Sequence, residues 1–233
     1  MLTGGADGDL LKGYDGPDIL RGNDGADWLY GGDGADTLNA GAGADNIFGG
    51  DSSADLRDVV YAGAGNDTVD AGYGNDLVYG GDGDDDIAGG FGVDELIGQG
   101  GNDVITGSAW SDEIFGGEGD DFLNGGFGCD RLNGGSGADR FYHLGIADHG
   151  NDWIQDYNAA EGDVLLYGEG AGPATASDFL VQYTETAGAG VSGTEEAFIT
   201  HIPSGLLMWA LVDGADQDHI YLRTGGDTFD LLG

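Results

Sequence analysis

The aspartates of this chain recur at a fixed spacing, and that spacing is the strongest chemical signal in the sequence. Residues 62 to 106 form five consecutive nine-residue units, AGAGNDTVD AGYGNDLVY GGDGDDDIA GGFGVDELI GQGGNDVIT. Position 6 of each unit is aspartate, position 8 is aliphatic, and positions 1, 2 and 4 are mostly glycine. Carboxylate oxygens beside the carbonyls of a glycine-rich turn are hard ligands in irregular geometry, which calcium tolerates better than magnesium. The pattern therefore predicts a series of calcium sites.

The aspartate column extends along most of the chain in phase with the apolar column, which runs from Leu11 to Phe141. One apolar position in nine does not fit an α-helix, whose apolar residues recur every three or four positions. It fits a tight turn and a short strand stacked on copies of itself, with position 8 inward and positions 7 and 9 outward. The predicted ligands at position 6 are Asp9, Asp18, Asp27, Asp36, Asp45, Asp58, Asp67, Asp76, Asp85, Asp94, Asp103, Asp112, Asp121, Asp130 and Asp139.

These units resemble the GGxGxDxUx repeats of the RTX (repeats-in-toxin) family of secreted bacterial proteins. The resemblance spans residues 4 to 142. It implies an all-β fold, a right-handed parallel β-roll in which two repeats make one coil. It also implies multiple Ca²⁺ ions, each between the turn of one repeat and the turn of the next repeat but one. The ligands would be the carbonyls of positions 2 and 4 with the aspartate of one repeat, and the carbonyls of positions 1 and 3 with the aspartate of the other.

Applied to this sequence, the resemblance implies defined ligand sets. One site would use Gly63, Gly65 and Asp67 with Gly80, Asp82 and Asp85. Another would use Gly72, Gly74 and Asp76 with Gly89, Phe91 and Asp94. Turn positions of the same kind are Gly22, Asp24, Gly25, Gly31, Asp33, Gly34, Gly81, Gly83, Gly116, Gly117, Gly119, Gly126, Gly128, Gly134 and Ser136.

Two repeats depart from the pattern. In residues 49 to 61, GGDSSADLRDVVY, four extra residues enter the turn before the phase resumes at Asp58, and we interpret them as a loop insertion. In residues 107 to 115, Trp110 occupies position 4, where the left-handed backbone conformation disfavours tryptophan. Asp7 holds the same position in the first repeat, and aspartate tolerates that conformation better. We expect the calcium sites that share the Trp110 turn to be distorted or empty.

The charge of the chain limits its partners. Among 233 residues, 6 are Lys or Arg and 44 are Asp or Glu, for a formal net charge of −38. This charge argues against nucleic acid as a partner and would repel an anionic membrane. It also opposes compaction, so the repeats should be unfolded until cations bind. Cys129 has no cysteine partner within the chain, so stability must come from metal and packing.

The ends of the chain indicate how the protein is exported. Residues 1 to 20 contain no signal-peptide pattern, and no apolar run approaches the roughly twenty residues of a membrane span. Leu2 and Thr3 fall in the second half of a repeat, so we interpret the chain as the carboxy-terminal piece of a longer protein, with a natural short protein as the alternative. The ending DTFDLLG resembles the signal read by type I secretion machinery. Together with the repeats, it implies a secreted, extracellular bacterial protein.

Residues 143 to 233 form a second predicted unit after the repeat domain of residues 1 to 142. Strands are predicted at 163–167, 179–183, 197–202, 207–212, 220–222 and 228–231, with a hairpin turn at Pro203-Ser204-Gly205. This unit resembles the cap that follows RTX repeats in serralysin-type proteases. Asp152 is position 6 of a degenerate last repeat, and the spacing of Asp156 and Asp163 matches a calcium-ligand pair of that family. The alternative for Asp156 and Asp163 is two surface aspartates in turns.

No arrangement of residues predicts catalysis. The four histidines are scattered, and neither HExxH nor GxSxG occurs. We predict that the chain is not an enzyme, and that any catalytic domain would lie upstream of it. The favoured function is a calcium-dependent folding, stabilising and export module. The alternatives are an extracellular structural or adhesive protein, and an accessory module of a polysaccharide-active enzyme, as the similar modules of mannuronan epimerases would allow.

Outward positions of alternate repeats predict an apolar stripe along one face of the roll. Neighbours in such a column lie about 4.8 Å apart. A continuous stripe on so charged a protein indicates a contact surface. We expect residues 143 to 233 to fold back over it, with a homodimer or a polysaccharide as alternatives. The stripe consists of Val59, Leu77, Tyr61, Tyr79, Ile97 and Phe115, whereas the opposite face at the same height carries Thr68, Asp70, Asp86 and Ala88.

Overall fold

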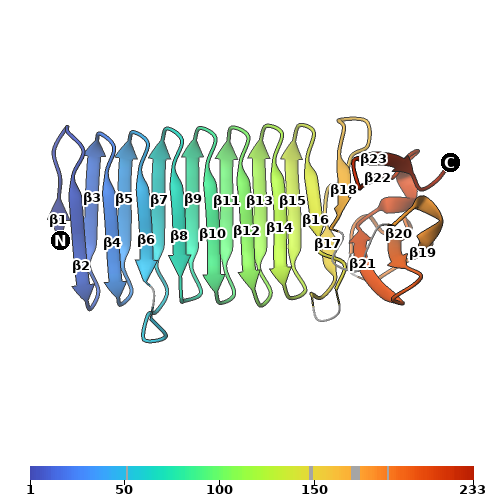
Figure 1. Ribbon diagram of the computed structural model, residues 1–233, viewed down its shortest axis with the longest axis horizontal. Coiled ribbons are helices and arrows are strands. Elements are labelled where there is room, and N and C mark those ends of the chain that lie inside the picture. The colour runs from blue at the N-terminus through green and yellow to red at the C-terminus, as the bar shows by residue number, and fades with distance from the viewer. Residues whose placement is uncertain (51, 147–148, 169–173, 188) are drawn as a thin grey trace.

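The fold is a stack of short parallel strands wound into two facing sheets. The computed structural model describes residues 1–50, 52–146, 149–168, 174–187 and 189–233. Successive repeats lie on opposite sides of the roll, so each strand pairs in parallel with the strand two repeats away (Figure 1). The predicted all-β fold is confirmed as a parallel β-roll of about 8 turns.

The strands alternate between the sheets along the roll. The first sheet contains, in spatial order, β1 (Leu2–Thr3), β3 (Ile19–Asp24), β5 (Thr37–Ala42), β7 (Val59–Ala64), β9 (Leu77–Asp82), β11 (Glu95–Gly100), β13 (Glu113–Glu118), β15 (Arg131–Ser136), β17 (Asp152–Ile154), β21 (Leu206–Leu211), β20 (Glu196–His201) and β19 (Phe179–Thr184). The second contains β2 (Leu10–Asp15), β4 (Trp28–Asp33), β6 (Asn46–Gly50), β8 (Thr68–Gly72), β10 (Asp86–Phe91), β12 (Val104–Ala109), β14 (Phe122–Phe127), β16 (Arg140–His143), β18 (Val164–Tyr167), β22 (Tyr221–Thr224) and β23 (Asp227–Asp230).

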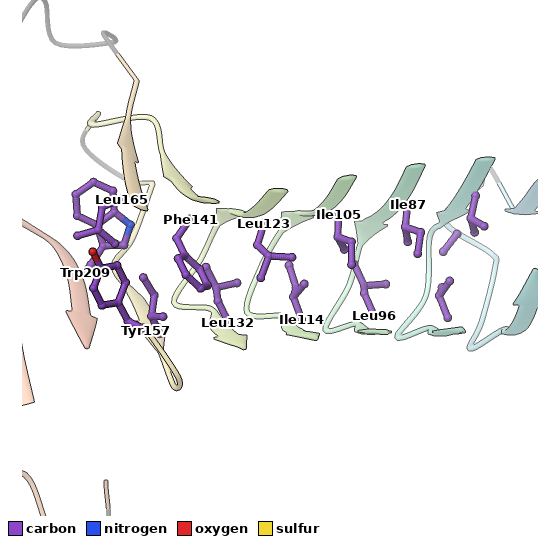
Figure 2. Packing of buried hydrophobic residues seen from close by; sticks show 14 of the residues in the cluster. Ile87, Leu96, Ile105, Ile114, Leu123, Leu132, Phe141, Tyr157, Leu165 and Trp209 are labelled. Carbon is purple, nitrogen blue, oxygen red and sulfur yellow. The ribbon is translucent and has the colours of Figure 1, made fainter. Parts of the chain in front are cut away.

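The register of the strands places equivalent repeat positions on top of one another. Val60 pairs with Val78 between β7 and β9, and Ile87 pairs with Ile105 between β10 and β12. The side chains at position 8 are buried along the whole roll and form two facing rows, one from each sheet (Figure 2). Burying one aliphatic side chain contributes about 1.5–3 kcal/mol. Because each coil adds only one such residue per sheet, the core of the roll is thin.

The carboxy-terminal strands continue the roll and then close it. β17 and β18 stack in parallel on β15 and β16, and β21 and β22 stack on them in turn. β20, β19 and β23 then add in antiparallel orientation. Trp209 and Tyr157 lie at the end of the core beyond Phe141 (Figure 2). Short 3-10 helices occupy Ala176–Asp178 and Gly214–Asp216, and no helix of the described residues is long and apolar enough to cross a membrane.

The strands predicted after residue 142 are confirmed, with small shifts at their ends, and Pro203-Ser204-Gly205 lies in the turn between β20 and β21. The prediction that residues 143 to 233 cover the apolar stripe is wrong, because they extend the roll along its axis instead (Figure 1). The last coil presents unpaired backbone groups that added strands satisfy, whereas the stripe offers only side chains. The stripe itself is present: the rings of Tyr61 and Tyr79 stack with centroids 5.2 Å apart.

Candidate calcium sites

Two rows of buried aspartates run along the roll, one at the turns that precede each sheet. In each row, Oδ1 of an aspartate accepts the backbone N–H of the equivalent aspartate one coil earlier. Asp67 N–H donates to Asp85 Oδ1 at 2.9 Å, and Asp76 N–H donates to Asp94 Oδ1 at 2.8 Å. The row before the second sheet contains Asp9, Asp27, Asp45, Asp67, Asp85, Asp103, Asp121, Asp139 and Asp163. The row before the first sheet contains Asp18, Asp36, Asp58, Asp76, Asp94, Asp112, Asp130 and Asp152.

The second carboxylate oxygen, Oδ2, is buried along both rows. In the part of the chain that the structure describes, Oδ2 has no hydrogen-bond partner in any row member from Asp27 to Asp130, nor in Asp152. A buried polar atom without a partner costs about 1–3 kcal/mol, and more when it is charged. So regular a repetition of the same unpaired oxygen indicates a common ligand rather than an isolated defect. A hard divalent cation fits this position.

The turns bring backbone carbonyl oxygens beside these carboxylates. A Cβ added at Gly80, which is position 1, would lie 2.5 Å from Oδ2 of Asp85 and 2.8 Å from the carbonyl oxygen of Gly98 in the next coil. A Cβ at Gly65, which is position 4 with a φ of 127°, would overlap the carbonyl oxygen of Gly43 in the preceding coil. Carboxylate and carbonyl oxygens therefore converge in space that a side chain would fill. This donor set fits calcium.

The predicted ligand sets lie together in adjacent coils. In the first set, Gly65 N–H donates to the carbonyl oxygen of Asp82 at 2.7 Å, next to the Asp67–Asp85 pair. In the second, Gly74 N–H donates to the carbonyl oxygen of Phe91 at 3.0 Å. A carbonyl that accepts one N–H keeps a second lone pair for a cation. Calcium binding by these oxygens stays a prediction. The other members of the two sets lie in the last residues of the strands that lead into these turns, namely Gly63 in β7, Gly72 in β8, Gly80 in β9 and Gly89 in β10.

The remaining predicted turn residues repeat this arrangement in their own coils. Gly25 N–H donates to Ala42 and Gly119 N–H donates to Ser136, both at 2.8 Å. Asp7, at position 4 of the first repeat, does not take a positive φ. No group of three or more His, Cys, Asp or Glu side chains that could hold a metal occurs within the described ranges. The other predicted positions at or beside the turns are Gly22, Asp24, Gly31, Asp33, Gly34, Gly81, Gly83, Gly116, Gly117, Gly126, Gly128 and Gly134.

Burial raises the pKa of the row aspartates above their usual value of 3.8. The pKa of Asp76 rises to about 8, chiefly because of burial and further because of the charges of Asp94 and Asp58. Burial raises the pKa of Asp85 and of Asp121 to about 7. The metal-free roll therefore holds its carboxylates partly protonated at neutral pH. The rows favour any ligand that brings positive charge.

Trp110 keeps its turn instead of disrupting it. Its φ is 87°, its N–H donates to the carbonyl of Phe127 at 2.6 Å, and Asp112 stays in its row. The bond from Gly92 N–H to the carbonyl of Ala109 is long, at 3.4 Å. The turn keeps its register because the side chain is exposed and the left-handed strain costs only about 1–2 kcal/mol. Distortion of the calcium sites that share this turn stays a prediction, as does their calcium occupancy.

The insertion brings a carboxylate that the nine-residue template did not predict. The loop between β6 and β7 projects beyond the neighbouring turns (Figure 1). In this loop Asp55 is buried, its Oδ1 accepts the N–H of Gly34 at 3.0 Å, and its Oδ2 has no partner among the described residues. The available signal was an acidic residue inside an insertion next to a predicted site, three residues before Asp58. Counted back from Asp58, Asp55 falls at position 3, and the template missed it because only the backbone carbonyl of position 3, and not its side chain, was predicted as a ligand.

The aspartates at the carboxy-terminal end of the roll have additional backbone partners. Asp163 joins a row by accepting the N–H of Asp139 at 2.9 Å through Oδ1, and its Oδ2 accepts the N–H of Asn158 at 2.8 Å. Asp156 accepts the N–H of Gly134 at 2.9 Å and that of the following glycine at 2.7 Å. Both oxygens of these carboxylates are therefore satisfied, unlike those of the regular rows. Calcium binding by this pair stays a prediction.

Comparison with known proteins agrees with this geometry. The family model "RTX calcium-binding nonapeptide repeat (4 copies)" matches residues 3–38, 30–53, 54–87, 61–96, 79–109, 88–123 and 106–141, together more than half of the chain. No curated protein is significantly similar in sequence. Among solved structures, the solution structure of the AlgE6R3 subunit from the Azotobacter vinelandii mannuronan C5-epimerase matches with 23% identity and a TM-score of 0.31, over 59% of this chain and 72% of that chain. The chain therefore belongs to the family of RTX calcium-binding nonapeptide-repeat proteins.

Proposed function

We propose that this chain binds several calcium ions, folds when they bind, and serves as the folding, stabilising and export module of a secreted protein. The observation that carries the proposal is the double row of buried Oδ2 atoms that have no partner in the described structure. The thin core cannot offset the free-energy cost of burying these carboxylates, because each coil buries only one aliphatic side chain per sheet at position 8. Binding of a cation is therefore expected to be part of folding.

Residues of two adjacent coils would together bind one ion. Between residues 62–70 and 80–88, the ligands would be the carboxylates of Asp67 and Asp85 with the carbonyls of Gly63, Gly65, Gly80 and Asp82. When bound, the ion supplies the positive charge that the carboxylates lack. The chain does the rest: Oδ1 holds the preceding turn in place, the glycines let carbonyls approach closely, and the position 8 side chains exclude water.

The calcium requirement suits export in an unfolded form. Extracellular calcium modules bind with dissociation constants of about 10⁻⁴–10⁻³ M, which would leave the chain unfolded in the cytosol and folded outside. The terminal segment supports the same order of events, because β23 pairs with β22 in the folded state. A type I secretion apparatus would therefore read this segment before the protein folds.

A calcium titration followed by circular dichroism tests the folding proposal. In chelator we expect the spectrum of an unfolded chain, and on adding calcium a cooperative gain of β signal. Magnesium is the control, and it should substitute poorly because it demands a stricter octahedral geometry. A native β spectrum in EDTA would contradict the proposal.

Export needs a separate test. The intact chain and a variant without residues 227–233 would be produced in bacteria that carry a type I apparatus. We expect only the intact chain in the medium. Calcium-dependent folding of the purified truncated chain is the control that separates a lost signal from a lost fold. Equal amounts of both chains in the medium would contradict the export proposal.

A further inference from the structure

The loop between β6 and β7 rebuilds a turn with a side chain in place of a backbone carbonyl. In regular turns the N–H at position 4 donates to the carbonyl at position 3 of the next coil, as Gly65 does to Asp82 at 2.7 Å. At the insertion the position 4 donor is Gly34, and it donates instead to Oδ1 of Asp55 at 3.0 Å. Oδ1 of Asp55 therefore stands where the position 3 carbonyl oxygen stands in other coils.

The rest of this turn keeps the placement of Leu56 and Asp58 but changes one backbone bond. Leu56 N–H donates to the carbonyl oxygen of Gly34 at 2.9 Å, whereas a regular position 4 N–H donates to position 3 of the next coil. A Cβ added at Gly74 would overlap the carbonyl oxygen of Leu56, which is the contact that a position 4 carbonyl makes in regular coils. Asp58 follows at position 6, and its Oδ1 accepts the N–H of Asp36 at 2.7 Å. The insertion thus puts a carboxylate in the place of one carbonyl and leaves the Leu56 carbonyl and the Asp58 carboxylate in register, while the Gly34 carbonyl accepts the Leu56 N–H in addition.

The second oxygen of Asp55 is buried and faces the turn. Asp55 is 7% exposed, and its Oδ2 has no hydrogen-bond partner in the described part of the chain. A Cβ at Gly50 would overlap Oδ2, which places this oxygen against position 2 of the same turn. Burial, and also the charges of Asp36 and Asp33, raise the pKa of Asp55; burial, and also the charge of Asp55, raise that of Asp58. Oδ1 of Asp55 and Oδ1 of Asp58 accept the N–H groups of Gly34 and Asp36 in the same facing turn, so both carboxylates adjoin the candidate site.

We propose that Asp55 is a calcium ligand through Oδ2, in the site between the turn of residues 31–36 and the turn that the insertion rebuilds, and that this site binds calcium more tightly than the regular sites. The proposal rests on the proposed function, because it assumes that the rows bind calcium. A carboxylate contributes a full negative charge where a carbonyl contributes a dipole, and calcium affinity depends on the number of charged ligands. We expect the additional charge to tighten this site roughly tenfold.

The substitution Asp55→Asn isolates this charge. Asparagine keeps the size of the side chain and can still accept the N–H of Gly34, so the loop should keep its shape. The matched control is Asp86→Asn, which removes a charge at the outward position 7 of a regular repeat, where the side chain is exposed and belongs to no predicted ligand set. Asp55→Glu keeps the charge and provides the rescue variant.

Calcium alone is the probe, with affinities from isothermal titration calorimetry and ion counts from native mass spectrometry. We expect wild type and Asp86→Asn to show a class of one ion bound more tightly than the rest. We expect Asp55→Asn to bind that ion roughly tenfold more weakly and Asp55→Glu to restore part of the difference. Circular dichroism at saturating calcium should show the same fold for all four proteins.

Two results would overturn the role of Asp55 alone: an unchanged tight class in Asp55→Asn, or an Asp55→Asn protein that stays unfolded at saturating calcium while wild type folds. The second would mean that Asp55 serves the structure of the loop. A wild-type chain that neither binds calcium nor folds with it would overturn the proposed function and this inference together.

Discussion

The regular roll and the carboxy-terminal strands bury different kinds of side chain. Each coil of the roll buries one aliphatic residue per sheet and one aspartate per turn. At the carboxy-terminal end, antiparallel strands surround larger side chains, including Trp209, Met208 and Phe179. We therefore expect the roll to depend on a ligand for stability, whereas the end of the chain has a thicker apolar core of its own. A repetitive fold can depend on bound ions for part of its stability and still need an end that is stable through apolar packing.

The largest expected effect is the loss of the roll on calcium removal. Hydrogen exchange measured by mass spectrometry in EDTA should show amides of residues 10–142 exchanging close to the rate of an unfolded chain. Amides of β20 and β21 should exchange more slowly, because their protection comes from apolar packing. The calcium-saturated protein is the control. Equal protection of both regions in EDTA would contradict the expected difference in their stability without calcium.

The next effect concerns pH in the absence of calcium. Burial raises the pKa of Asp67 to about 6, of Asp112 to about 7 and of Asp76 to about 8, all from 3.8. The metal-free fold thus binds more protons than the unfolded chain between these values, so its stability is fully present below about pH 4 and is lost as pH rises through 6 to 8. Acidifying the chelated protein from pH 8 to pH 5 should restore β signal in circular dichroism.

Two buried histidines oppose this trend near the end of the roll. Burial lowers the pKa of His143, and it lowers that of His149 to about 4. Their contribution is present above the unfolded value of about 6.5 and is lost as pH falls toward 4. The aspartates outnumber them, so the net gain on acidification should appear in the roll. A β signal in EDTA that rises with pH would contradict the assignment.

The roll could be predicted from the sequence because its register is local. The constant nine-residue period places Asp67 next to Asp85 and Val60 next to Val78, two repeats later. Equivalent positions in the sequence are therefore stacked in the structure. The pairing of β21 with β17 has no such period, since residues far apart in the chain meet at the end of the stack. The position of the carboxy-terminal strands was therefore mispredicted, although the strands themselves were recognised.

The candidate sites show the same limit. The position 6 aspartates were found because they repeat, whereas the side chain of Asp55 reaches the site from position 3 only because the inserted loop redirects it. Trp110 illustrates a second limit. Conformational preference is a cost of about 1–2 kcal/mol for one residue, and the ladder of bonds on both sides of the turn can impose the left-handed conformation on tryptophan.

A smaller effect should come from relieving this strain. Trp110→Gly removes the left-handed penalty and should stabilise the calcium-bound fold by about 1 kcal/mol, because the side chain is 63% exposed and packs little. Ser108→Gly, at position 2 with a φ of 84°, is the matched variant and should act in the same direction. Denaturant unfolding at saturating calcium provides the measurement. A loss of stability in Trp110→Gly would show that the indole makes a stabilising contact.

The smallest effect is expected on the apolar stripe. Tyr79→Asp removes the stack with Tyr61, which is worth about 0.5–1.5 kcal/mol. The loss of stability should lie at the lower end of this range because Tyr61 is 42% exposed. The carboxy-terminal strands do not cover this surface, so their protection from exchange should not change. Tyr79→Ser serves as the control for the added charge. Detachment of the carboxy-terminal strands in Tyr79→Asp would contradict the arrangement seen here.

The pairing of alternate repeats determines what a change in repeat number does to the surface. Removing eighteen residues, a full coil in the regular part, would leave every later side chain on its original face. Removing residues 80–88 alone would still bury an aliphatic residue at each position 8. It would, however, move all later outward residues to the other face, so that Tyr79 would neighbour Thr106 in place of Ile97. The loss of one repeat preserves burial at position 8, but only the loss of two preserves the face on which later outward residues lie. Any partner that recognises one face of the roll therefore restricts gains and losses of repeats to even numbers.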